Sequence, residues 1–364
     1  MNHTTYLTPG PSALYFTVEQ HLRTALREQI PSVSHRSQTF KDIFRHTDAQ
    51  LRTLLEIPEG YHITFTSSAN EVWERLIQNC VNRHSHHFVN GAFSHKFHQF
   101  STRLGREATR TEAAWGAGFN DPQQFVANDT ELIAVTLNET STGVQFPKTD
   151  LQKLRAAHPE ALLAVDATSG IPVLEVPIQE IDSLYFSVQK AFGLPAGLGV
   201  WITNERCLQK ARAREAEGQI TGTYHRLTEL VRRAQEYQTP ETPNMLGIYL
   251  LGKVCEDMNT KGIAQIRREA TYKATLLYHA LEQHPLLSPF VAAPEWRSPT
   301  VVVADIQSAD ETAATLIERF REQGIELGSG YGKMKTRQLR FANFPTHSKE
   351  LIERVTDLLP QLVT

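Results

Sequence analysis

Residues 183–197 read Ser-Leu-Tyr-Phe-Ser-Val-Gln-Lys-Ala-Phe-Gly-Leu-Pro-Ala-Gly, an apolar run that leads into Lys190. The run has the length and the aromatic content of a buried strand, and the glycines and the proline after it predict a loop. A second apolar run, Leu162 to Asp166, ends in an acid. Because ligands bind at the carboxyl ends of the strands of an open α/β sheet, the lysine and the acid are both candidates for one site.

A lysine and an aspartate in these positions suit one kind of chemistry. The amine of Lys190 can form a Schiff base with the aldehyde of pyridoxal phosphate, and the carboxylate of Asp166 can keep the pyridine nitrogen protonated. Taken singly, a lysine at a strand end is more often solvated and an aspartate there more often caps a helix. Together they predict a pyridoxal phosphate enzyme with Lys190 and Asp166 as its catalytic residues.

The composition is that of an ordinary globular enzyme. The chain has 364 residues, 40% hydrophobic and 21% charged, which is enough for two domains. A formal net charge of −3 gives no reason to expect nucleic acid as a partner. No apolar run approaches the length of a membrane span, and the first residues do not resemble a secretory signal. Three widely separated cysteines favour free thiols in a reducing cytoplasm.

Short β-branched runs alternate with amphipathic stretches from about residue 60 to about residue 205. This alternation predicts an α/β sheet with helices on both faces. Strands are expected at Tyr61 to Thr66, His87 to Asn90, Leu132 to Leu137, Leu162 to Asp166, Ser183 to Ser187 and Gly199 to Thr203.

A second, smaller α/β unit is expected after Pro240 and Pro243. A long helix should begin near Asn244 and, after a break at Gly262, continue to Glu282. Strands at Thr300 to Ile306 and Gln338 to Ala342, with helices at Glu311 to Gln323 and from Ser348, would complete the unit. We predict a large domain of residues 16–250 and a small domain of residues 1–15 and 251–364.

Two further segments join a predicted strand to a predicted helix. In Phe65-Thr-Ser-Ser-Ala-Asn-Glu71, the N–H groups of Ser68 and Ala69 could bind a phosphate dianion, although a plain helix cap explains them equally well. In Gly91-Ala-Phe-Ser-His95, Phe93 could lie against a pyridine ring, although an aromatic residue there is commonly part of the core.

Two polar loops are also candidates. In Leu137-Asn-Glu-Thr-Ser-Thr-Gly143, the Thr140 hydroxyl could bind the cofactor, but turn chemistry explains such a cluster too. Ile30-Pro-Ser-Val-Ser-His-Arg-Ser37 could bind an anionic substrate through its cation, but it could also be an exposed loop.

Nine segments, in their order along the chain, resemble the class V aminotransferases, and most of all the phosphoserine aminotransferase branch. The resemblance covers nearly the whole chain. It implies the aspartate aminotransferase-like fold type I of pyridoxal phosphate-dependent transferases, with a large mixed or parallel sheet domain and a smaller α/β domain. The segments are Thr8-Pro-Gly-Pro-Ser, Ser34-His-Arg-Ser, Thr66-Ser-Ser-Ala-Asn-Glu, Gly91-Ala-Phe, Asn138-Glu-Thr-Ser-Thr-Gly, Asp166-Ala-Thr-Ser, Gln189-Lys, Thr242-Pro-Asn and Leu339-Arg-Phe-Ala-Asn.

The resemblance also implies roles for single residues. Lys190 would hold the cofactor covalently and then move the proton between the substrate and the cofactor, and Asp166 would pair with the ring nitrogen. Phe93 would stack on the ring where phosphoserine aminotransferases usually carry Trp. Thr242 matches a threonine that reaches the cofactor from the second subunit, which implies a homodimer with shared active sites. The remaining cofactor ligands would be Ser68, Ala69, Thr140, Thr168 or Ser169, and Gln189.

Substrate binding is implied less completely. Arg340 matches the family arginine that grips the α-carboxylate of the substrate, and His35 and Arg36 match a pair that holds a substrate phosphate. An arginine expected within Thr66 to Asn70 is absent, as is a second His-Arg pair before Arg340. The lysines of the segment Tyr331-Gly-Lys-Met-Lys-Thr-Arg337, Lys333 and Lys335, could restore positive charge, or the segment could be a solvated loop.

The resemblance therefore implies a cytoplasmic transaminase of serine biosynthesis that acts on small amino acids and 2-oxo acids, with phosphoserine as donor and 2-oxoglutarate as acceptor. Transamination of alanine or serine with glyoxylate is the alternative, because it needs fewer cations. A non-catalytic binding protein of the same fold would commonly lack the lysine or the aspartate. Cysteine desulfuration is disfavoured because no cysteine follows Cys255, and no metal site is expected from the histidine spacing.

Overall fold

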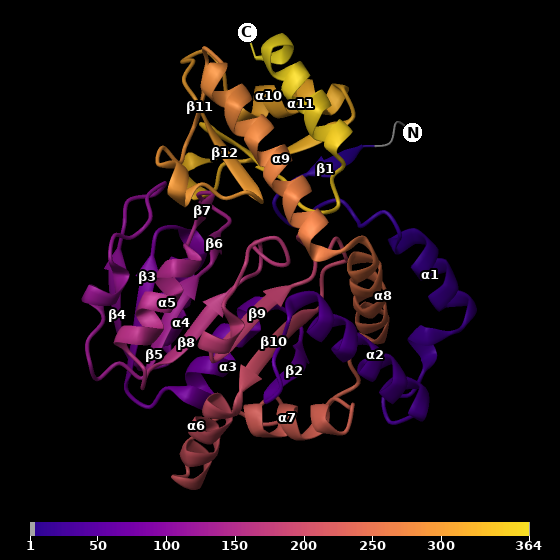
Figure 1. Cartoon of the computed structure of the whole chain (residues 1–364), viewed down its shortest axis with the longest axis vertical. Helices are drawn as coiled ribbons and strands as arrows, with labels where there is room; N and C mark the ends of the chain where they lie inside the picture. Colours follow the sequence, from indigo (N-terminus) through magenta and orange to yellow (C-terminus); the bar gives the residue numbers. More distant parts are fainter. Residues whose placement is uncertain (1–3, 364) are drawn as a thin grey trace.

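The computed structural model describes residues 4–363 and contains two main sheets, one above the other in Figure 1. The larger sheet has the order β2-β10-β9-β8-β5-β3-β4. β10 is antiparallel to both of its neighbours, and the other pairs are parallel, so the sheet is mixed as predicted. Its strands are β2 (Tyr61–Thr66), β3 (His84–Val89), β4 (Glu107–Glu112), β5 (Leu132–Thr136), β8 (Leu162–Asp166), β9 (Ser183–Ser187) and β10 (Gly199–Asn204).

Helices cover both faces of this sheet because successive strand residues point to opposite sides. In β8, Leu163 and Val165 pack into one core with the helices α1 (Val18–Arg27), α2 (Gln38–Leu55), α5 (Lys148–Ala157) and α8 (Met245–Lys261). Leu162 and Ala164 pack into the other core, with the helices α3 (Ala69–Cys80), α4 (Ala92–Arg103), α6 (Glu205–Ala216) and α7 (Leu227–Gln235). Burial on both faces explains why this strand reads as a continuous apolar run.

The strand β3 starts three residues earlier than the sequence predicted and ends at Val89. The prediction missed His84, Ser85 and His86 because these residues are polar, yet all three are buried. Their side chains are hydrogen-bonded inside the protein: the rings of both histidines lie 2.8–3.0 Å from the Thr109 hydroxyl. Satisfied polar groups can be buried at low cost, which a reading of hydrophobicity alone does not reveal.

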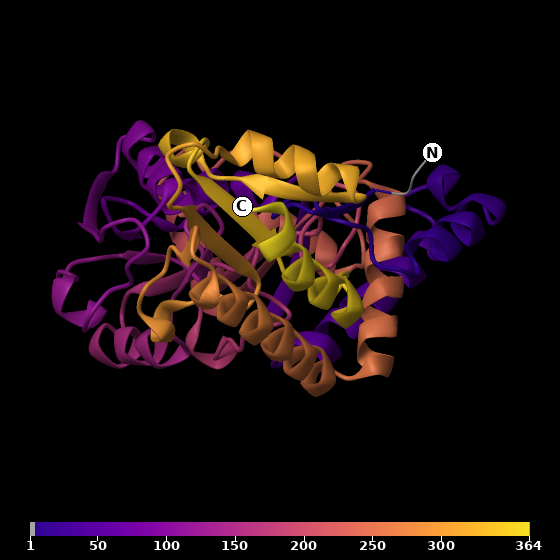
Figure 2. The ribbon, with the colours of Figure 1, turned by 90° about the horizontal axis from the view of Figure 1, so that it is seen from above.

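The smaller sheet has the order β1-β13-β14-β12-β11, and only β1 is parallel to its neighbour. β1, drawn in indigo, therefore lies among the orange and yellow elements of Figure 1. Seen from above, the small sheet and its helices lie over the middle of the molecule (Figure 2). The elements are β1 (Thr5–Leu7), α9 (Ile263–Gln283), β11 (Leu287–Pro289), β12 (Val301–Ile306), α10 (Ala313–Glu322), β13 (Ile325–Ser329), β14 (Gln338–Ala342) and α11 (Lys349–Leu362).

Short elements connect the two parts. A two-stranded ribbon of β6 (Asn138–Glu139) and β7 (Val144–Gln145) follows β5 at the base of the small sheet (Figure 1). Single-turn 3₁₀ helices lie in the loops: η1 (Ile30–Ser32), η2 (Pro122–Phe125), η3 (Ile178–Glu180), η4 (Pro294–Trp296) and η5 (Gly332–Met334).

The predicted domain boundary at residues 250 and 251 falls inside α8. The buried hydrophobic residues of that helix, from Met245 to Met258, all belong to the core of the large sheet. The change of core occurs within α9, where Ala270 packs with the large sheet and Ala274 with the small one. We therefore propose that the domains divide within α9. Residues 1–3 and 364 of the predicted small domain lie outside the described part of the chain.

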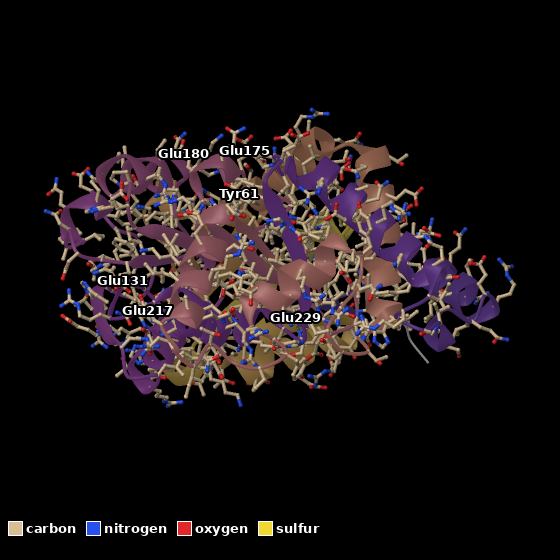
Figure 3. All side chains as sticks on the ribbon, turned by 90° about the horizontal axis from the view of Figure 1, so that it is seen from below. Tyr61, Glu131, Glu175, Glu180, Glu217 and Glu229 are labelled. Atoms are coloured by element: carbon tan, nitrogen blue, oxygen red, sulfur yellow. The ribbon has the colours of Figure 1, made fainter. Side chains whose placement is uncertain are left out.

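The side of the molecule seen from below carries acids that are spread out, not gathered in one place (Figure 3). At this side the Tyr61 hydroxyl donates hydrogen bonds to the carbonyl oxygens of Ile178 (2.7 Å) and Ile181 (2.8 Å), which ties β2 to η3. Glu175 forms a 3.1 Å ion pair with Lys148. The labelled acids are Glu131, Glu175, Glu180, Glu217 and Glu229.

The described residues lack two other kinds of feature. Among the helices of residues 4–363, none has both the length and the apolar content that a membrane crossing requires. The same part of the chain contains no group of three or more His, Cys, Asp or Glu side chains placed to hold a metal ion.

Candidate active site

A cavity of about 220 Å³ lies at the carboxyl ends of β5, β8 and β9. The register of the strands explains its position, because Thr136 pairs with Asp166 and Asp166 with Tyr185, so the strand ends are level. The lining residues come from segments around both sheets: Pro9, Gly10, Asn70, Phe93, Thr136, Asn138, Thr140, Asp166, Thr168, Ser187, Gln189, Lys190, Tyr331 and Arg340.

Lys190 is buried in the wall of this cavity, with 7% of its surface exposed. Its Nζ atom donates a 2.8 Å hydrogen bond to the Thr140 hydroxyl and lies 5.0 Å from the centroid of the Phe93 ring. Burial lowers the pKa of Lys190 to about 8, although the charges of Asp166 and Glu139 oppose the change. A larger share of the amine is therefore neutral, and nucleophilic, than in an exposed lysine.

Gly10 fits closely against this lysine. A side chain at Gly10 would place its Cβ atom 2.8 Å from Cε of Lys190, and the backbone φ of +131° also favours glycine. The loop after β1 thus packs on the stem of Lys190.

Burial alone does not distinguish Lys190 from other lysines. Lys273 in α9 is also buried, and burial lowers its pKa to about 8 as well. Its Nζ atom, however, donates to the carbonyl oxygens of Phe344 (3.1 Å) and His347 (2.7 Å), and it lines no part of the cavity. Lys190 differs because its amine faces a space that a ligand can enter.

Asp166 is held at the end of β8 by two donors. The backbone N–H of Thr168 donates to Oδ1 (3.0 Å), and Nε1 of Trp73 donates to Oδ2 (3.1 Å). Burial raises the pKa of Asp166, and hydrogen bonds with Thr168 and Trp73 oppose that rise. The sequence analysis did not single out Trp73, whose only signal was its place one turn after Asn70 on α3.

Arg340 closes the cavity from β14 of the small sheet. Its Nε atom donates to the carbonyl oxygen of Ser329 (2.7 Å), and one terminal nitrogen donates to the carbonyl oxygen of Thr140 (3.1 Å). Burial lowers the pKa of Arg340 to about 10, so the guanidinium stays charged at neutral pH. Its Cζ atom lies 5.7 Å from the centroid of the Tyr331 ring.

Phe93 is positioned by a buried carboxylate that the sequence analysis did not assign. Oε2 of Glu139 accepts hydrogen bonds from the N–H of Phe93 (3.2 Å) and of Ser94 (2.9 Å), in the first turn of α4. A carboxylate is stabilised there by the helix dipole. Glu139 therefore fixes the helix end that carries Phe93, whose ring centroid lies 5.4 Å from that of Tyr331.

The start of α3 also faces the cavity, but one of the two backbone N–H groups expected to bind a phosphate is already hydrogen-bonded within the protein. Ser68 caps the helix and Asn70 of the first turn lines the cavity. The Ala69 N–H donates a 2.8 Å hydrogen bond to the Ser187 hydroxyl, so it is already engaged. Oε1 of Gln189 is buried with no hydrogen-bond partner among residues 4–363. A phosphate group next to this helix end would find a positive dipole and could accept a hydrogen bond from Nε2 of Gln189, whereas Oε1 would need a donor.

Thr168 and Ser169 were alternatives in the sequence analysis, and the structure separates them. Thr168 lines the cavity. Ser169 lies behind it, where its hydroxyl accepts from Thr140 (2.8 Å) and donates to the carbonyl oxygen of Asn138 (2.9 Å). An amine, a carboxylate, a flat aromatic ring and a helix end thus surround one space, and they fit pyridoxal phosphate.

Eight residues expected at the site do not line this cavity: Ser68, Ala69, Ser169, His35, Arg36, Thr242, Lys333 and Lys335. The Thr242 hydroxyl lies 3.2 Å from Nδ1 of His35. Lys333 lies 5.4 Å from the centroid of the Trp115 ring. Lys335 lines a neighbouring hollow of about 790 Å³, which shares Pro9, Gly10 and Arg340 with the cavity.

Arg36 is engaged within its own chain. Its guanidinium donates to Oε1 of Gln238 (2.7 Å) and to the carbonyl oxygens of Thr239 (2.8 Å) and Pro240 (3.0 Å). Arg36 therefore holds the loop that precedes Thr242, and the two residues lie in one cluster with His35.

Known proteins resemble this chain over its whole length. A curated relative, the phosphoserine aminotransferase of Nocardioides sp., is 26% identical over 349 residues, which cover 95% of this chain and 92% of the relative. The crystal structure of a phosphoserine aminotransferase SerC from Cytophaga hutchinsonii is 43% identical, with a TM-score of 0.97 and 100% of both chains covered. The alanine–glyoxylate aminotransferase of Nostoc sp. has the same fold, at 20% identity and a TM-score of 0.80, over 100% of this chain and 96% of that one.

The family model Aminotransferase class-V matches residues 8–335. This range contains Lys190, Asp166 and every other lining residue except Arg340. The match confirms the family, the fold and the cofactor that the sequence predicted. The chain belongs to the class V aminotransferases and is a transaminase that uses pyridoxal phosphate.

Proposed function

We propose that this transaminase passes the amino group of O-phospho-L-serine to 2-oxoglutarate, forming 3-phosphooxypyruvate and L-glutamate in serine biosynthesis. The observation that carries the proposal is that Thr140 joins the two reacting ends of the site: its hydroxyl binds Lys190 and its carbonyl oxygen binds Arg340. A substrate with its amine at Lys190 and its α-carboxylate at Arg340 fits this pair. The full-length similarity to proteins named phosphoserine aminotransferase supports the choice of donor.

Lys190 and Asp166 would be the catalytic residues. The bound cofactor supplies an electron sink beside the substrate α-carbon. Lys190 would hold the cofactor aldehyde until the substrate amine replaces it, after which its Nζ atom would carry the proton from the α-carbon. Asp166, fixed by Trp73 and Thr168, would hold a proton on the ring nitrogen.

Arg340 would orient the substrate. A guanidinium binds a carboxylate through two parallel hydrogen bonds, which fixes the direction of the bound group. With the α-carboxylate held in this way, the α-proton would be left for Nζ of Lys190 to remove. Phe93 would cover one face of the ring, and the start of α3, with Ser68, Asn70, Thr168 and Gln189, would surround its phosphate.

A homodimer with shared sites is part of the proposal. Thr242, His35 and Arg36 lie together, away from the cavity of their own chain. Such a cluster suits a role in the site of a second subunit, where Thr242 would reach the cofactor phosphate and His35 the substrate. We place the enzyme in the cytoplasm because Cys80, Cys207 and Cys255 are buried free thiols.

Transamination of alanine or serine with glyoxylate is the second candidate. It is favoured by the engagement of Arg36, whose three hydrogen bonds to residues 238–240 leave it less able to grip a phosphate. Arg36→Ala separates the two. Loss of phosphoserine turnover far beyond loss of alanine turnover supports the phosphate role, and equal losses remove it.

The proposed function is tested by a half-reaction. The cofactor-loaded protein is mixed separately with phosphoserine, serine and alanine, and the change in cofactor absorbance is followed. Faster conversion by phosphoserine supports the proposal, and faster conversion by alanine or serine moves the enzyme to the glyoxylate-type reaction. Lys190→Ala should abolish conversion by every donor; turnover retained in this variant contradicts the central assignment.

A further inference from the structure

Lys96 lies on α4, one turn after Phe93, and points at the outer wall of the active-site cavity. Its Nζ atom donates a 2.7 Å hydrogen bond to the hydroxyl of Tyr331. The same atom lies 5.3 Å from the ring centroid of Phe93 and 5.3 Å from that of Tyr331. Both rings line the cavity, and Lys96, which is not itself a lining residue, contacts the cavity wall that they form.

The charge of Lys96 is not neutralised by the protein around it. Lys261, for comparison, pairs with Glu269 at 2.6 Å and Lys253 with Glu256 at 2.9 Å. Within residues 4–363, no carboxylate forms an ion pair with Lys96, whose hydrogen-bond partner is an uncharged hydroxyl. An ammonium has three N–H donors, so two remain available to a ligand.

Shared aromatic rings limit how far Lys96 lies from Lys190 and from Arg340. Lys190 Nζ lies 5.0 Å, and Lys96 Nζ 5.3 Å, from the centroid of the same Phe93 ring, so their separation cannot exceed these two distances combined. Arg340 lies 5.7 Å from the Tyr331 ring that Lys96 also approaches. The cavity therefore has an amine site at Lys190 and a carboxylate site at Arg340, and a second cation lies against the two rings, Phe93 and Tyr331, that line it.

We infer that Lys96, together with the Tyr331 hydroxyl, binds the distal anionic group of the substrate: the phosphate of phosphoserine and the γ-carboxylate of glutamate and 2-oxoglutarate. The inference rests on the proposed function, which requires two dianionic substrates. It also supplies the cation that the segment Thr66 to Asn70 does not provide. Arg340 then binds the α-carboxylate, which all amino acids share, and Lys96 binds the distal anionic group, which distinguishes one donor from another.

The first test compares two unreactive acids that differ by one carboxylate. Glutarate and butyrate are titrated calorimetrically into the cofactor-loaded wild type and Lys96→Met. A charge-assisted hydrogen bond contributes enough that the variant should bind glutarate about 10–100-fold more weakly. Butyrate, which has no second carboxylate, should bind both proteins equally.

The second test measures the half-reaction with phosphoserine, glutamate and alanine. Lys96→Met should lower the rate per concentration of phosphoserine and glutamate about 10–100-fold and leave that of alanine unchanged. Lys96→Arg should restore most of the loss, because it keeps the charge. Lys210→Met is the matched control, since Lys210 is an exposed lysine on α6.

The outcomes separate the inference from the proposed function. Equal loss with glutarate and butyrate, or no loss with either, overturns the role of Lys96 whatever the natural donor is. If the wild type does not convert phosphoserine, the proposed function fails, and the glutarate and glutamate measurements still decide the role of Lys96. Thermal unfolding checks that Lys96→Met is folded; if it is not, Lys96→Gln replaces it in both tests.

Discussion

The amine of Lys190 donates a 2.8 Å hydrogen bond to the hydroxyl of Thr140. Thr140 in turn donates to the Ser169 hydroxyl at 2.8 Å, and its carbonyl oxygen accepts from Arg340 at 3.1 Å. One residue therefore sets the positions of the groups that meet the substrate amine and the substrate carboxylate.

Thr140→Val should separate these two functions. The valine keeps the shape and the carbonyl oxygen that Arg340 uses, but it removes the hydroxyl acceptor, so the charged form of Lys190 loses support and its pKa falls further. We expect kcat/KM to fall roughly tenfold, the effect of one hydrogen bond. Steady-state kinetics and the pH dependence of cofactor uptake measure both effects. An unchanged pH dependence contradicts the role given to the hydroxyl.

The pH dependence of cofactor uptake follows from the burial of Lys190. Its pKa in the folded protein, about 8, lies below that of an ordinary lysine, so half of the amine is neutral and reactive at about pH 8 and nearly all of it about one pH unit higher. The rate at which the protein stripped of cofactor takes up pyridoxal phosphate should be half of its maximum near pH 8 and should level off near pH 9. A rate that keeps rising to pH 10 indicates a lysine of ordinary pKa.

Asp166→Asn should preserve cofactor binding and lower the rate at least about 100-fold, because an amide cannot hold the proton on the ring nitrogen. It should also destabilise the protein by about 1–3 kcal/mol, since Asp166 accepts from both Thr168 and Trp73 and an amide has only one acceptor oxygen. Kinetics and thermal unfolding measure the two effects. Trp73→Phe is the control, because it removes one hydrogen-bond donor and keeps the carboxylate of Asp166. If Trp73→Phe loses as much activity as Asp166→Asn, the loss is not due to the charge of Asp166.

His225 links the start of α3 to the loop that carries Thr242. It contacts Glu71 of α3 and lies 3.0 Å from Glu241. Burial alone would lower the pKa of His225, but the two carboxylates outweigh it and raise the pKa to about 9. Burial likewise opposes the hydrogen bonds from His225 and Ser67 that lower the pKa of Glu71 to about 2.

His225→Gln should therefore destabilise the protein in a pH-dependent way. The contribution of a histidine with a raised pKa is complete below its unfolded value of about 6.5 and is lost as the pH rises through about 9. We expect a loss of about 1–3 kcal/mol at pH 6, reduced because the carboxylates are partly exposed, and a smaller one at pH 10. Urea unfolding of both proteins at the two pH values tests this, and equal losses contradict a charged His225.

Much of the large sheet could be predicted from the sequence. The strands β2, β8 and β9 begin and end where predicted. For β8 and β9 the reason is that they lie inside the sheet, paired in parallel and buried on both faces, so their sequences are largely apolar. Lys190 and Asp166 could be placed in one site for the same reason, since adjacent strands end at the same edge. The helices α1 and α2 were not predicted, and neither were the edge strands β1, β4 and β11 or the interior strand β13.

The rest of the site depends on contacts between distant parts of the chain. Tyr331 and Arg340 enter the cavity from the small sheet, and Trp73 reaches Asp166 from α3. From the sequence, Arg36 is a candidate cation for anion binding in a loop. In the fold, its guanidinium donates hydrogen bonds to the carbonyl oxygens of Thr239 and Pro240. Such pairings are set by tertiary structure, and no local pattern in the sequence carries them.

The pairing of β1 with β13 has a consequence for synthesis of the protein. Thr5–Leu7 leaves the ribosome long before its partner Ile325–Leu327, and the strands of the large sheet are made between the two. Until β13 is made, the loop after β1 has no sheet to hold Gly10 against Lys190. A nascent chain can therefore build the large sheet early, but it cannot form a finished active site before β13 has left the ribosome.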